Sequence, residues 1–142
     1  MKKIVLAISL VVAFAMSAFA QNEPEITFEK STAEFGDIKQ GQVVNATFKF
    51  KNTGKSPLVL QNVQSTCGCT VPSWPKDPIA PGKSAEITAT FNSAGKMGQQ
   101  NKVITIFSNA KTSQSQVSII CNVLPPDPPA TEPAPQAAPP KN

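Results

Sequence analysis

The chain of 142 residues contains no histidine, no tyrosine and no arginine. Without histidine it lacks Ser–His and Cys–His nucleophile pairs, imidazole metal ligands, and the side chain that titrates most readily near neutral pH. Its nine acidic residues form no calcium-loop pattern, and their spacing indicates no carboxylate pair for acid–base catalysis. We therefore expect a protein that is not an enzyme, with no catalytic residues and no bound cofactor.

Long apolar runs are also missing beyond the N-terminus, where the first 20 residues have the pattern of a secretory signal peptide. Met1-Lys2-Lys3 is basic, residues 4–14 are nearly all apolar, and Ala18-Phe19-Ala20 places small residues where a signal peptidase reads. The apolar run is shorter than the roughly 20 residues of a membrane-spanning helix. We predict cleavage before Gln21 and an exported protein, periplasmic or extracellular, with no membrane span in the mature chain.

Positive charge is modest and dispersed. The formal net charge of +4 falls by two, to +2, when Lys2 and Lys3 leave with the signal peptide. The other lysines are scattered along the chain, whereas nucleic acid is recognised largely by arginine and clustered basic residues. The sequence therefore predicts a solvated surface and no nucleic-acid partner.

Apolar and polar residues alternate with a period of two along most of the remaining chain, which is typical of strands with one buried face. In residues 44–51, Val44, Ala46, Phe48 and Phe50 share one face. We expect further strands at residues 26–29, 58–63, 67–71, 85–91, 103–107 and 117–123, separated by turn residues. About seven short strands predict an all-β fold, an immunoglobulin-like antiparallel β-sandwich. A small β-barrel is the alternative, because strand patterns alone do not settle closure.

The composition changes after Leu124, where proline and alanine dominate residues 125–142. Such a segment cannot join a sheet or bury much apolar area. We therefore divide the chain into a signal peptide at 1–20, a β-sandwich domain at 21–124 and a disordered Pro-rich tail at 125–142.

Cys67-Gly68-Cys69 is where chemistry is most to be expected. On an extended strand, residues two apart face the same side, and three interpretations stay open. The two cysteines form a disulfide if Gly68 allows a kink or bulge; such a bridge would be easily reduced and would act as a redox element. Alternatively, Cys121 pairs with one of them and joins the last strand to the middle of the fold, or it is an inert buried thiol.

The third interpretation is a soft metal. Two thiolates on one face, without histidine, suit Cu(I) better than a hard ion, so Cys67 and Cys69 are candidate Cu(I) ligands. Met97, in a glycine-flanked loop, offers a thioether whose position the sequence does not give. The alternative to all three interpretations is that the cysteine pair is purely structural, since buried cysteine usually behaves as a small hydrophobe.

Trp74 lies in a proline-rich connection just past the cysteine pair. It is a candidate contact for a partner. It is equally a candidate cover for the end of the core, because tryptophan is highly buried on average.

Several motifs in order resemble the bacterial domain-of-unknown-function family 1573. They are Phe35-Gly36-Asp37-Ile38, Gly41, Phe48 to Gly54, Pro57-Leu58, Ser65 to Thr70, Pro78 to Ser84 and Ser108-Asn109. The resemblance spans roughly Phe28 to Val123 and implies an immunoglobulin-like sandwich, related to the domains of major sperm protein and hydin, in an exported protein. It also marks the Cys-Gly-Cys-Thr stretch, residues 67–70 here, as a family hallmark, and it implies no activity.

We therefore expect an exported β-sandwich that acts as a binding or structural module for a protein or cell-envelope partner. The alternative is a periplasmic Cu(I)-binding or thiol-redox protein that acts through Cys67 and Cys69.

Overall fold

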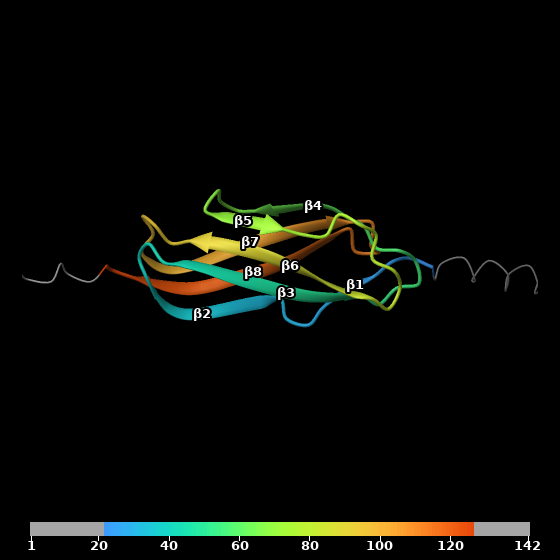
Figure 1. The fold of residues 1–142 in the computed structure, drawn as a ribbon, viewed down its shortest axis with the longest axis horizontal. Coiled ribbons are helices and arrows are strands. Elements are labelled where there is room, and N and C mark those ends of the chain that lie inside the picture. Colours follow the sequence, from blue (N-terminus) through green and yellow to red (C-terminus); the bar gives the residue numbers. More distant parts are fainter. Residues whose placement is uncertain (1–21, 127–142) are drawn as a thin grey trace, which may run out of the picture.

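Two four-stranded sheets face each other in the structure, a computed structural model that describes residues 22–126 (Figure 1). Strand order is β1-β3-β6-β5 in one sheet and β2-β8-β7-β4 in the other. The strands are β1 (Ile26–Phe28), β2 (Thr32–Lys39), β3 (Val43–Asn52), β4 (Leu60–Ser65), β5 (Thr70–Ser73), β6 (Ser84–Asn92), β7 (Gly98–Ser108) and β8 (Gln114–Leu124). The predicted all-β sandwich is confirmed, and residues 22–126 contain no helix.

The core lies between the sheets and follows from the alternation in the sequence. Along β3, Val44, Ala46, Phe48 and Phe50 are buried and the residues between them are exposed. The same alternation in β6, β7 and β8 supplies the rest of the core, because successive side chains of a strand point to opposite faces. The largest fully buried apolar side chains are Phe48, Phe50, Leu58, Ile87, Phe91, Ile104, Ile106, Val117, Ile119 and Val123.

The structure has eight strands where about seven were expected, and the additional one is β2. Its alternation is broken at Gly36, whose φ of 62° lies in the left-handed region that favours glycine. The register with β8 shifts between Glu34 and Asp37, so the buried positions on the two sides of this bulge are out of phase. Pairing of β2 with β8 is parallel, a departure from the antiparallel sheets that we predicted.

Asn52, at the end of β3, is a fully buried polar side chain that joins the N-terminal segment to two loops. Its amide donates to the carbonyls of Ser56 and Ile79, at 2.8 and 2.9 Å. Its side-chain oxygen accepts from the N–H groups of Gly54 and Glu25, at 3.0 and 3.4 Å. One side chain therefore satisfies backbone groups from three segments.

Gly54 completes this corner through close packing. A side chain there would collide with the backbone of Glu23 and Pro24, so the N-terminal segment can cross the turn only where Cβ is absent.

The described chain enters and leaves the sandwich at opposite ends (Figure 1). The predicted signal peptide, and nearly all of the predicted disordered tail, lie outside the described residues. Pro125 and Pro126, which are described, follow β8 as exposed, irregular chain.

Candidate functional site

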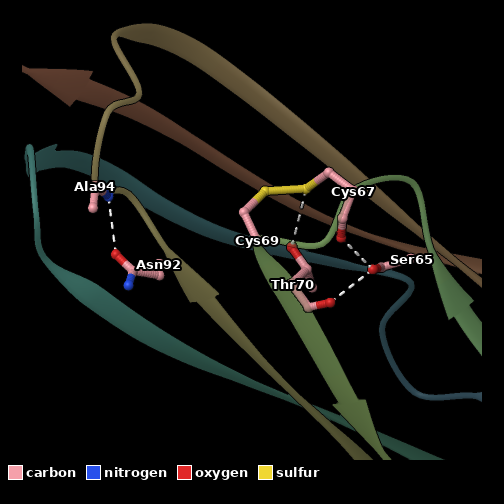
Figure 2. The surroundings of a disulfide bond; sticks show 6 residues. All are labelled: Ser65, Cys67, Cys69, Thr70, Asn92 and Ala94. Carbon is pink, nitrogen blue, oxygen red and sulfur yellow. Dashed lines mark hydrogen bonds between the residues drawn. A yellow bond between two sulfur atoms is a disulfide. The ribbon is translucent and has the colours of Figure 1, made fainter.

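Cys67 and Cys69 are joined by a disulfide in the turn between β4 and β5 (Figure 2). Their Cα atoms lie 5.3 Å apart. We expected the pair to lie on a strand. In the structure β5 begins only at Thr70, so both cysteines lie in the turn before it. The turn brings the two sulfurs together where an extended backbone would place the Cα atoms near the long limit for a bridge.

Hydrogen bonds hold this turn independently of the bridge. The Ser65 hydroxyl lies 2.7 Å from the carbonyl oxygens of both Cys67 and Thr70 and donates its proton between them. The Thr70 N–H donates to the Cys67 carbonyl at 3.3 Å. Ser65 ends β4 and Thr70 begins β5, so this contact links the two strands across the turn (Figure 2).

The two sulfurs have different surroundings. Cys67 Sγ lies 3.9 Å from the hydroxyl oxygen of Thr70, a side chain that is 3% exposed. Cys69 instead lines an open depression of about 490 Å³, and the other lining residues are Val43, Gly68, Thr90, Asn92, Ala94 and Lys96. Apart from Gly68, these neighbours come from β3, β6 and the loop after β6, so no local pattern in the sequence predicted them.

Cys121 is a free thiol on β8, with 2% of its surface exposed. Burial raises the pKa of this thiol above its usual value, and the charge of Lys102 opposes that shift. A bridge from Cys121 to the pair is not present, and the thiol lies in the core as the alternative interpretation expected.

The Cu(I) interpretation stays a prediction. Both candidate ligands, Cys67 and Cys69, are bonded to each other here, so a metal would require the reduced form. Among residues 22–126 no group of three or more cysteine, aspartate or glutamate side chains is arranged to hold a metal ion. Met97 is exposed and does not line the depression at Cys69.

Trp74 packs in part against the core, at the start of the connection after β5. The Lys76 ammonium lies 3.1 Å from the centroid of the indole ring, a cation–π contact. The indole N–H is buried and has no hydrogen-bond partner. On its outer side, Trp74 borders a shallow depression of about 480 Å³ shared with Pro75 and β6. Covering the core is thus part of its role, and contact with a partner stays a prediction.

Within the described part of the chain, no helix is long and apolar enough to span a membrane.

A family model described as "Protein of unknown function (DUF1573)" matches residues 26–123. The chain belongs to this family. The resemblance carried by the sequence motifs is therefore confirmed, and the Cys67–Cys69 disulfide lies within the matched region. A search of curated proteins finds no match.

Solved structures similar to this DUF1573 domain place it among immunoglobulin-like sandwiches. A protein of unknown function from Porphyromonas gingivalis W83 aligns with a TM-score of 0.63 at 16% identity, over 75% of this chain and 50% of that one. The ASH/PapD-like domain 7 of human CEP192 gives 0.60 at 8% identity, over 75% and 89%. The YadV chaperone gives 0.51 at 13% identity, over 77% and 55%.

The chain spans half of the P. gingivalis protein and 55% of YadV. Two proteases and a glycoside hydrolase also match, over 23% to 32% of their own chains. At such low identities these similarities establish the fold alone.

Proposed function

We propose that this protein is an exported, non-enzymatic module that binds a protein or cell-envelope partner along the open edge of β2. The observation that carries the proposal is that β2, with eight residues, pairs on one side only, with β8. An exposed sheet edge accepts an added strand through main-chain hydrogen bonds. The PapD-like and chaperone neighbours share this sandwich and are compatible with such a module.

The edge of β5 is poorly suited to strand addition. Asn92 on β6 donates its N–H to the Cys69 carbonyl at 3.0 Å, so Thr70 and Pro72 are the residues whose backbone faces outward. Pro72 has no N–H to donate. The N–H of Thr70 is bonded to the Cys67 carbonyl. This edge therefore offers no free backbone donor over the length of β5.

The edges of β1 and β4 are weaker candidates than that of β2. β1 has three residues, too few to template a strand of ordinary length. β4 has six residues, against the eight of β2, and so offers a shorter edge.

Backbone groups of β2 face the open side both before and after its bulge. The Ser118 N–H donates to the Ser31 carbonyl at 2.8 Å, so Ser31 and every second residue after it, up to the bulge, point their backbone groups toward β8. Past the bulge the Gln40 N–H donates to the Leu124 carbonyl at 2.9 Å. Thr32, Glu34, Asp37 and Lys39 therefore direct their N–H and C=O groups to the open side, where those of Lys39 are bonded to Gln42. β2 carries Glu34 and Asp37 against one cation, Lys39, and we expect a partner strand with basic or polar side chains.

A photo-crosslinking side chain at Thr32 tests the surface. In the envelope fraction of the native host we expect a defined adduct from position 32 and none from position 47, where Thr47 is exposed on the outer face of β3. Glu34→Pro removes one outward-facing N–H without removing a β2–β8 hydrogen bond. It should weaken binding at least about fivefold, since a backbone hydrogen bond contributes roughly 1 kcal/mol.

Glu34→Ala is the matched control, because it keeps the N–H and removes only the carboxylate. If Glu34→Pro folds normally by circular dichroism and binds the crosslinked partner as tightly as Glu34→Ala, the β2 edge is not the binding surface. Equal adducts from positions 32 and 47 would refute the proposal in the same way.

Export is supported by the signal-peptide pattern and is tested separately. N-terminal sequencing of the protein recovered from the native host should begin at Gln21, and the protein should fractionate with the periplasm or the medium. A chain that retains Met1 and stays in the cytoplasm would contradict it.

A further inference from the structure

The Cys67–Cys69 bridge adds little to the stability of the fold. A disulfide stabilises mainly by restricting the unfolded chain, and more so for longer loops. This one closes a loop over a single intervening residue, Gly68. The same turn is already held by the hydrogen bonds of Ser65 and Thr70. A bridge that is not needed to hold the fold, in a turn that is partly exposed, is available for chemistry.

We infer that this bridge is a thiol–disulfide exchange site, with Cys69 as the attacked sulfur and Cys67 as the leaving group. The inference is independent of the strand-edge proposal, and it adds to the binding module a stoichiometric reaction in which the bridge is consumed. Cys69 lines the depression through which a thiol can approach. Cys67 lies beside the buried Thr70 hydroxyl, which can donate to a thiolate as it forms. Thiol–disulfide exchange is fastest when the leaving sulfur is the better-stabilised thiolate.

The reaction balances without a cofactor. A substrate thiolate attacks Cys69 Sγ, a substrate–Cys69 bond forms, and the S–S bond breaks with its electron pair passing to Cys67. The second thiol of the substrate, as its thiolate, then attacks the substrate sulfur of this mixed disulfide and releases Cys69. The substrate leaves oxidised by two electrons as a disulfide. Cys67 and Cys69 are left as a dithiol, after uptake of the two protons released by the substrate thiols.

The depression suits a cysteine within a polypeptide. Its volume of about 490 Å³ accommodates a cysteine and neighbouring side chains. Val43, 50% exposed, gives an apolar contact in the lining, and Lys96, another lining residue, brings a positive charge that attracts the anionic thiolate. We therefore assign a dithiol polypeptide as the substrate class, in preference to a small thiol such as glutathione.

The first test identifies the attacked sulfur. The purified full chain is mixed with a reduced peptide that contains two cysteines, quenched in acid at short times, alkylated and mapped by mass spectrometry. We expect the peptide adduct on Cys69, loss of the bridge, and an unmodified Cys121 as the internal control for a folded chain. An adduct on Cys67, or a bridge that survives excess peptide dithiol in the folded chain, would overturn the inference.

The second test addresses Thr70 as a positioning residue. Thr70→Val keeps the shape of the side chain and removes the hydroxyl, so exchange should slow roughly tenfold, as expected for loss of a hydrogen bond to a charged sulfur. Thr70→Ser should restore the rate, which a purely structural role would not predict. If Thr70→Val does not fold, the exchange rate of Thr70→Ser and the position of the adduct still test the role of the hydroxyl. Exchange that is tenfold slower in Thr70→Ser than in the unchanged protein would contradict that role.

The third test distinguishes the two thiol sources. Val43→Asn, which removes the apolar contact without adding charge, should slow exchange with the dithiol peptide several-fold and leave exchange with glutathione unchanged, while Val43→Ile should preserve both rates. Equal slowing with both thiols, or no slowing with either, would show that the depression does not select a polypeptide.

Discussion

Replacement of Asn52 by alanine is the sharpest test of how this fold is held together. The side chain is fully buried, and it satisfies two carbonyls, those of Ser56 and Ile79, and two N–H groups, those of Gly54 and Glu25. In Asn52→Ala the Ser56 carbonyl and the N–H groups of Gly54 and Glu25 lose this partner, and the Ile79 carbonyl keeps only its bond from the Leu58 N–H at 2.9 Å. The bond to Ile79 is buried and the other three are part-buried, so water can replace them only in part.

The size of the effect follows from the four bonds. At roughly 1 kcal/mol of net stability for each, Asn52→Ala should lower the free energy of unfolding by about 4 kcal/mol. Total stabilities of domains are about 5–15 kcal/mol, so this single change would remove a large share. With a slope of about 2 kcal/mol per molar in urea, the unfolding midpoint should fall by about 2 M.

Urea unfolding followed by circular dichroism measures this shift. Asn45→Ala is the matched control on the same strand, since Asn45 is exposed and accepts one hydrogen bond, from the Thr90 hydroxyl at 2.7 Å. Its effect should stay within about 0.5 kcal/mol, as for most surface changes. If Asn52→Ala loses no more stability than Asn45→Ala, the buried amide does not hold the corner.

Two further predictions concern stability. Gly54→Ala should destabilise the fold by at least about 2 kcal/mol, because the added methyl group would collide with the backbone of Glu23 and Pro24. Gly68→Ala is the control, since a methyl group there meets open space. It should change the free energy of unfolding by less than about 0.5 kcal/mol in the same urea assay. For Cys121, burial raises the folded-state pKa above the usual 9.0, so the folded chain keeps a proton that the unfolded chain loses. The free energy of unfolding should therefore fall as pH rises above about 9, with a smaller fall in Cys121→Ala, and identical slopes between pH 8 and pH 10 would contradict this.

Alternation made the core strands predictable. In β3, β6 and β8 the buried residues, apart from Asn52 at the end of β3, are the apolar members of a period-two pattern, because each strand packs one face on the opposite sheet. β2 was not predicted, because Gly36 shifts the phase of that pattern in the middle of the strand. A glycine flanked by alternating residues is itself a bulge signal, and it could have identified the strand.

The surroundings of the cysteine pair were not predictable in the same way. A Gly-containing stretch between two strands could have indicated a turn in place of the strand that we expected at residues 67–71. The position of Cys69 beside Val43 and Lys96 depends on how β3, β6 and the following loop meet, which no local pattern encodes. That Cys121 stays unpaired likewise depends on its register on β8.

The parallel ladder between β2 and β8 has a mechanical consequence. The described chain enters ahead of β2 and leaves from the end of β8 at the other end of the sandwich (Figure 1). Once the three-residue β1 has been pulled from β3, tension between the two ends would load this ladder in shear, along the strands, so that its hydrogen bonds would share the force and have to rupture together. A domain tethered by both ends to separate supports would resist pulling far better than one whose end strands peel apart in sequence.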